Sequence, residues 1–89
     1  MLCCMPEISR FLGIVVSILY DDHNPPHFHA KYGQHEITVD ILNGRVTGWF
    51  PPRPLRYVLE WQALHELELL NDWHRASDHR PLIPIAPLE

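Results

Sequence analysis

The sequence is poor in cysteine, and this scarcity excludes two common kinds of small domain. The chain of 89 residues has two cysteines, Cys3 and Cys4, which are adjacent. Adjacent cysteines rarely form a disulfide because the geometry is strained, and they do not have the spacing of a zinc knuckle. The sequence therefore predicts neither a disulfide framework nor a cysteine metal centre, and both thiols are expected to be reduced.

Long apolar runs and an excess of positive charge are also absent. The apolar run 11–19 is too short to span a bilayer, and the first residues lack the basic stretch of a secretory signal. We therefore expect a cytoplasmic protein that does not enter the membrane. Lys and Arg number 7 against 11 Asp and Glu, for a net charge of −4. Nucleic acid is not expected as a general ligand, because proteins that coat phosphates are basic.

The composition and the prolines define one small domain. Hydrophobic residues make up 46% of the chain and charged residues 20%, which is typical of a globular domain with one thin core. Nine prolines mark element boundaries, since proline fixes φ and lacks a backbone N–H. We expect a flexible extension over 1–5, one domain over 6–89 and a proline-rich tail over 79–89.

Four segments have the residue pattern of β-strands: 11–20, 27–32, 35–42 and 45–50. Gly33-Gln34 and Asn43-Gly44 match two-residue hairpin turns, so the last three strands are expected to form a meander. The first turn places His27 opposite Asp40, and the second places Asp40 opposite Thr47.

Side chains alternate along a strand, so this register sorts the meander into two faces. The apolar face is expected to be covered and carries Phe28, Ala30, Ile37, Val39, Ile41, Val46 and Phe50. The polar face is expected to be open and carries His27, His29, Lys31, Glu36, Thr38, Asp40, Thr47 and Trp49.

Residues 54–75 have the apolar spacing of one long helix, with Pro54 in its first turn. The stripe expected to face the sheet consists of Leu55, Val58, Leu59, Ala63, Leu69, Leu70 and Trp73. Trp61 and Leu64 lie outside it and either pack on the first strand or the tail, or belong to a partner surface. The expected fold is α+β, a four-stranded antiparallel sheet with one long helix packed on one face.

The segment 21–29 contains three of the seven histidines. In a strand, His27 and His29 point to the same side with Cα atoms about 6.6 Å apart, which is close enough to share a metal. His23, His27 and His29 are therefore candidate ligands for Zn²⁺ or another transition metal. The supporting candidates are Asp21 and Asp22 as carboxylate ligands and Asp40 as the acceptor that fixes the tautomer of His27. A polar strand face or a partner contact explains the same residues without a metal.

Two other functions are compatible with these residues. One is a small metal-independent ribonuclease. In it His27 would act as general base and His29 as general acid, and Lys31 would stabilise an anionic transition state. Partner binding is the other, and its candidates are Trp49, Trp61, Leu64, Arg53 and Arg56.

Several segments resemble a small bacterial family of domains of unknown function. They are Ile8–Phe11, the segment DHNPPHFHA at 22–30 and the positions Val58–Trp61, Leu64, His65, Glu68–Leu70 and Trp73. The resemblance implies a short, single-domain cytoplasmic protein, and members often lie beside another small gene in arrangements like toxin–antitoxin pairs. It therefore implies a protein partner encoded by an adjacent gene, and no established activity. We favour a non-enzymatic interaction module, with metal binding and ribonuclease activity as alternatives.

Overall fold

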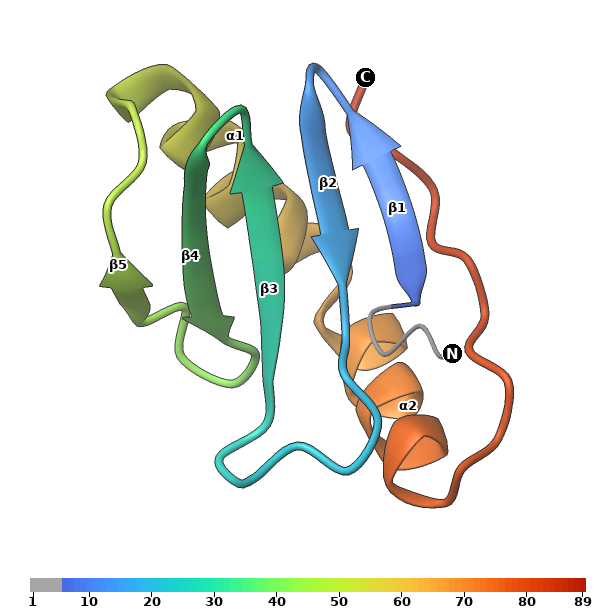
Figure 1. Cartoon of the computed structure of the whole chain (residues 1–89). Helices are drawn as coiled ribbons and strands as arrows, with labels where there is room; N and C mark the ends of the chain where they lie inside the picture. The colour runs from blue at the N-terminus through green and yellow to red at the C-terminus, as the bar shows by residue number, and fades with distance from the viewer. Residues whose placement is uncertain (1–5) are drawn as a thin grey trace.

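The computed structural model describes residues 6–89 and has an α+β fold. Within that range the strands are β1 (Glu7–Phe11), β2 (Ile14–Ser17), β3 (His27–Tyr32), β4 (His35–Asp40) and β5 (Val46–Gly48), and the helices are α1 (Pro52–Leu64) and α2 (Glu66–Ser77). The strands form one antiparallel sheet in chain order, with both helices on one side (Figure 1). The expected class and the meander of the last three strands are confirmed. The expectations for Cys3, Cys4 and the extension 1–5 lie outside the described residues.

The expected single strand over 11–20 is wrong, because this apolar run contains a hairpin. Leu12 and Gly13 both have positive φ, 51° and 82°, and they connect Phe11 to its partner Ile14. Two positive φ values are typical of the hairpin turns that suit twisted strands. Leucine rarely adopts positive φ, so the turn carries no strong sequence signal. The sheet therefore has five strands rather than four.

The pairing of β3 with β4 is confirmed residue by residue, and His27 lies opposite Asp40. The expected register of β4 with β5 is wrong by two residues, since Thr47 lies opposite Thr38. The reason is the carboxylate of Asp40, whose Oδ1 accepts the N–H groups of Leu42 and Asn43 and stabilises a longer connection. A shift of two residues leaves every side chain on its expected face.

The expected single helix over 54–75 is also wrong, because the chain leaves helical geometry at His65 (φ −122°, ψ 27°). No glycine or proline lies between 55 and 80, so the sequence offers no stop signal there. The break lets each helix present its own buried face. These faces consist of Pro54, Val58, Trp61 and Gln62 in α1, and Leu69, Asp72, Trp73 and Ala76 in α2. Leu55 and Leu59 of the expected stripe are only half-buried.

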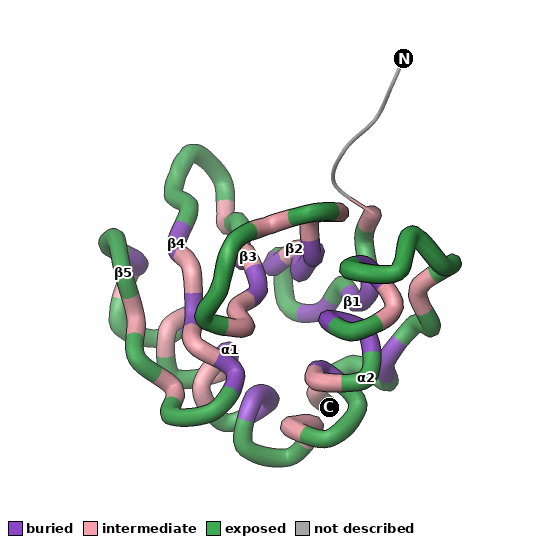
Figure 2. Tube along the Cα trace, turned by 90° about the horizontal axis from the view of Figure 1, so that it is seen from below, coloured by how far each residue is buried: buried purple, intermediate pink, exposed green. Residues whose placement is uncertain are grey.

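The core lies between the sheet and the helices, and Figure 2 shows the buried residues on these elements and mostly exposed connections around them. Trp61 is fully buried and contacts Phe11 and Phe28, with ring centroids 5.4 and 5.7 Å away. Its indole Nε1–H donates to the carbonyl of Ala86 at 2.9 Å. Trp61 therefore packs on the first strand and the tail, and its assignment as a partner-binding residue is wrong.

The tail after α2 runs beside β1 (Figure 1). The N–H of Ile85 donates to the carbonyl of Ile8 at 2.8 Å, which covers part of the β1 edge. The buried carboxylate of Asp72 accepts the N–H of Ile83 at 2.8 Å. Burial raises the pKa of Asp72 above its usual value, against the effect of this hydrogen bond.

Within residues 6–89, neither helix has the length and apolar composition needed to cross a membrane.

Truncation of Leu69 tests the packing of α2 against the sheet. Leu69 is fully buried, so Leu69→Ala should lower the free energy of unfolding by about 2–5 kcal/mol through lost burial and the cavity left behind. Leu67 lies in the same helix and is 82% exposed, so Leu67→Ala should change it by less than about 0.5 kcal/mol. Urea denaturation followed by circular dichroism measures both. Equal losses would show that α2 packs through a different face.

Candidate functional site

The connection between β2 and β3 folds over the polar face of the sheet at the start of β3. Its Asp22 side chain is 10% exposed, and the His27 and His29 side chains are 12% and 15% exposed. The ring of Trp73, from α2, lies 5.3 Å from the ring of His27. The expectation that this part of the polar face is open is therefore wrong, because Asp22 of the connection contacts both histidines and Trp73 packs against His27 at the end of the sheet.

One carboxylate and two imidazoles converge at this position. Oδ2 of Asp22 lies 2.9 Å from Nε2 of His27 and 3.3 Å from Nε2 of His29. The three residues each offer one ligand atom, and these atoms all lie within 4.8 Å of one another. His27 and His29 point to the same side because they alternate along β3, and the connection brings Asp22 to them.

The second ring nitrogens of the two histidines differ in their surroundings. Nδ1 of His27 lies 2.8 Å from the carbonyl oxygen of Pro25. A carbonyl only accepts, so this nitrogen carries a proton and donates. Nδ1 of His29 is buried with no hydrogen-bond partner among residues 6–89, and Oε2 of Glu36 lies 3.4 Å from it. The His27 ring is thus held from Nδ1 with its Nε2 directed at Asp22, whereas the His29 ring has a carboxylate near Nδ1 but no hydrogen bond to it.

Asp22 is held in its ionised form. Burial raises the pKa of Asp22, but the backbone N–H of His23, the hydrogen bond from His29 and the nearby charges of His27 and His29 outweigh it. The net effect places the pKa below its usual value. The N–H of His23 donates to Oδ1 at 2.9 Å, which leaves Oδ2 for the two imidazoles.

A positive charge must lie between the carboxylate of Asp22 and the imidazole of His27. If His27 is neutral with its proton on Nδ1, the lone pair of Nε2 faces a carboxylate oxygen only 2.9 Å away. Either a second proton or a metal ion must then lie between them. Zinc bonds of about 2.0–2.2 Å imply ligand atoms about 3.3 Å apart around a tetrahedral ion. The Asp22 contacts of 2.9 and 3.3 Å are close to that separation, and all three ligand atoms lie within 4.8 Å of one another, which makes the group a candidate site for one divalent cation.

The structure places the other expected ligands apart from this group. The side chain of His23 is 85% exposed, and its Nδ1 faces the other Asp22 oxygen, Oδ1, at 3.0 Å. Asp21 turns away to His79, with 2.6 Å between Oδ2 and Nε2. Asp40 does not orient His27 as expected, because Pro25 and Asp22 occupy the two ring nitrogens while Asp40 holds the β4–β5 connection.

The remaining candidates lie at the surface. Lys31 is exposed and lies on the same side of β3 as His29, directly opposite Glu36. The ribonuclease hypothesis stays a prediction. The partner-binding candidates other than Trp61 are all exposed, and they are Trp49, Leu64, Arg53 and Arg56.

Two residues of the site were missed by the sequence analysis. Glu36 reaches His29 from the diagonal position on β4, since Thr38 is the direct partner of His29. The β3–β4 register was sufficient to find this contact, because diagonal neighbours across strands are within reach of long side chains. Arg45 lines the same groove as Asp22 and His29, and only the longer β4–β5 connection places it there.

Acid titration tests the role of Asp22. Its pKa is lowered in the folded protein, so its stabilisation is present above about pH 4 and is lost as the pH falls through the folded-state pKa. At pH 5, Asp22→Asn should lower the free energy of unfolding of metal-free protein by about 1.5–3 kcal/mol, the range for hydrogen bonds to a charged group. This difference should shrink towards pH 2.5. The neighbouring control Asp21→Asn, whose carboxylate is exposed, should change stability by less than about 0.5 kcal/mol. An Asp22→Asn protein with the same acid sensitivity as the wild type would contradict this role.

Comparison with known proteins identifies a family. The family described as Domain of unknown function (DUF4160) matches residues 13–74, a range that contains Asp22, His27, His29 and Glu36. Neither a curated protein nor a solved structure matches the chain. The resemblance to a small family of domains of unknown function is thereby confirmed. The match covers most of the chain, which belongs to the DUF4160 family.

Proposed function

We propose that this domain binds a transition metal ion through Asp22, His27 and His29. The observation that carries the proposal is the convergence of one carboxylate oxygen and two Nε2 atoms, one of which belongs to a ring that Pro25 holds through its other nitrogen. Metal-binding histidines commonly donate their second ring N–H to a carbonyl or carboxylate. The carbonyl of Pro25 accepts this bond from His27, and the carboxylate of Glu36 lies 3.4 Å from Nδ1 of His29, close enough to accept it after a small movement. Asp22 takes the place in the ligand set that the sequence assigned to His23.

The chemistry and number of the ligand atoms limit which metal ions suit the site and whether the site is closed or open. Two imidazole nitrogens and one carboxylate oxygen suit Zn²⁺, Fe²⁺, Ni²⁺ or Cu²⁺ better than Mg²⁺ or Ca²⁺. Structural zinc sites have four protein ligands, whereas three protein ligands leave a position for a further ligand. We therefore propose a site that presents its metal to a bound molecule.

Zinc titration by isothermal calorimetry tests this proposal. Because thiolates also bind zinc, the measurement uses a background in which Cys3 and Cys4 are serine. One Zn²⁺ should bind per chain at pH 7.5. His27→Gln and Asp22→Asn should each lower the affinity at least about 100-fold, since even outer partners of metal ligands contribute 10–100-fold. The affinity should fall steeply towards about pH 5.5, because imidazole binds metal only when neutral.

Two further variants make this test specific. His74→Gln changes an exposed histidine of α2 and should bind Zn²⁺ like the parent. His23→Gln should weaken binding by less than about tenfold, the lower limit for an outer partner. If His27→Gln retains full affinity, or if His23→Gln loses as much as Asp22→Asn, the proposed ligand set is wrong.

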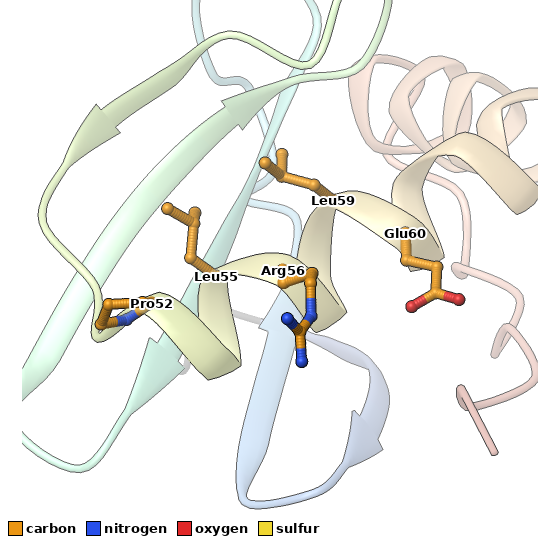
Figure 3. Close-up of a pocket in the computed structure, with 5 residues that line it drawn as sticks. All are labelled: Pro52, Leu55, Arg56, Leu59 and Glu60. Carbon is orange, nitrogen blue, oxygen red and sulfur yellow. The ribbon is translucent and has the colours of Figure 1, made fainter.

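A second candidate function is the binding of a protein partner on α1. We propose that a cytoplasmic partner encoded by an adjacent gene, as in toxin–antitoxin pairs, docks there. Pro52, Leu55 and Leu59 line an apolar groove of about 620 Å³ (Figure 3). In that view Leu55 and Leu59 project together, and Arg56 projects away from them. Leu64 is 66% exposed. Exposed apolar patches of this kind are typical of protein contacts.

Co-purification with the product of the adjacent reading frame tests this second function. Arg56, Glu60 and Leu64 follow one another at i+4 spacing along α1, so Leu64 extends the rim of the groove. Leu64→Glu should therefore weaken the complex at least about tenfold, as loss of a buried interface anchor does. Leu12→Glu changes another exposed leucine, 56% exposed, in the β1–β2 turn and serves as the control. Equal affinities of both variants, measured by calorimetry, would contradict docking on α1.

A further inference from the structure

The groove beside the candidate metal site is large enough for a small organic molecule. Its volume is about 970 Å³, near the upper end of the range of about 300–1,000 Å³ for ligand pockets. Asp22, His27 and His29 contribute to its lining, and so do Arg45 and Thr47. The metal ligands thus share one groove with a guanidinium and a hydroxyl that the metal site does not use.

The sheet places Arg45 in line with the metal ligands. His27 lies opposite Asp40, and the N–H of Asp40 donates to the carbonyl of Arg45 at 2.8 Å. Directly opposed residues share a face, with Cα atoms about 4.5–5.5 Å apart. The Cα of Arg45 therefore lies about 10 Å from that of His27 across one intervening strand. A parallel row on the same face consists of His29, Thr38 and Thr47.

The guanidinium of Arg45 is available to a ligand. Arg45 is exposed, and it makes no ion pair with any residue in the range 6–89. Its acidic neighbour Asp40 already accepts the N–H groups of Leu42 and Asn43 through Oδ1. Guanidinium groups bind carboxylates and phosphates through two parallel hydrogen bonds.

The charge of the groove depends on the metal. Asp22 and Asp40 contribute two negative charges and Arg45 one positive charge, so the carboxylates and guanidinium that line the groove sum to −1 without a metal. A bound divalent cation adds two positive charges and replaces the proton between His27 and Asp22, so the groove becomes more positive by one charge. An anion is then attracted both by the free coordination position of the metal and by Arg45. By linkage, each ligand must strengthen the binding of the other.

We propose that the groove binds a small molecule through an oxyanion group, a carboxylate or a phosphate, held jointly by the metal ion and by Arg45. This inference rests on the proposed metal site. The hydroxyl groups of Thr38 and Thr47, which line the same groove, are positioned to bind the polar remainder of the ligand.

Paramagnetic relaxation with two simple probes tests this inference. The full-length protein with Cys3 and Cys4 changed to serine is loaded with Co²⁺, and its visible spectrum reports metal binding. Inorganic phosphate is titrated and its ³¹P relaxation measured, and acetate is titrated separately with its methyl ¹H relaxation measured. At least one probe should show a saturable relaxation enhancement, and the responding probe identifies phosphate or carboxylate as the preferred group. Metal-free protein should bind neither probe.

Two arginine variants assign the anion contact. Arg45→Gln should retain the Co²⁺ affinity but weaken the bound oxyanion about 10-fold or more, as expected for loss of charged hydrogen bonds. Arg53→Gln, which changes an exposed arginine of α1, should behave like the parent. If Co²⁺ binds but neither probe saturates, or if Arg45→Gln binds the anion as tightly as the parent, this inference is overturned and the metal site stands. If Co²⁺ itself does not bind to Asp22, His27 and His29, both proposals are wrong.

Discussion

The contact of the Asp22 carboxylate with two imidazoles is the constraint on which this side of the molecule depends. It joins the β2–β3 connection to β3, since His27 and His29 both direct Nε2 at the same oxygen. A carboxylate that is 10% exposed is stable in that position only with compensating charge. The backbone N–H of His23 provides part of it, and the imidazoles or a metal between them provide the rest. The local order of this connection and the proposed metal binding therefore depend on the same few atoms.

The remainder of the fold supports this contact from both sides. The meander fixes the spacing of His27 and His29 and brings Glu36 behind His29. From the helical layer, Trp73 packs against the ring of His27. The tail is attached to β1 through Ile85 and to α2 through Asp72. Rigid elements that hold ligand side chains reduce the entropy lost on binding, so this framework favours a preformed site.

Much of the fold and part of the site could be predicted from the sequence. Gly33 supplies the positive φ of its turn, so the β3–β4 register and the shared side of His27 and His29 were predictable. The hairpin at Leu12 was not, because leucine is unusual there. Asp22 was named only as a supporting residue, since local spacing favours His23. The path of the β2–β3 connection, which local patterns do not encode, decides between them. The break at His65 likewise depends on packing rather than on a local signal.

The most direct measurement of the central claim is a crystal structure of the protein grown with one equivalent of Zn²⁺, with anomalous data collected above and below the zinc edge. The account predicts an anomalous peak about 2.0–2.2 Å from a carboxylate oxygen of Asp22 and from Nε2 of His27 and His29. It also predicts the Nδ1 hydrogen bond from His27 to Pro25 in the loaded site. Zinc bound elsewhere, with Asp22 still in direct contact with both imidazoles, would contradict the account.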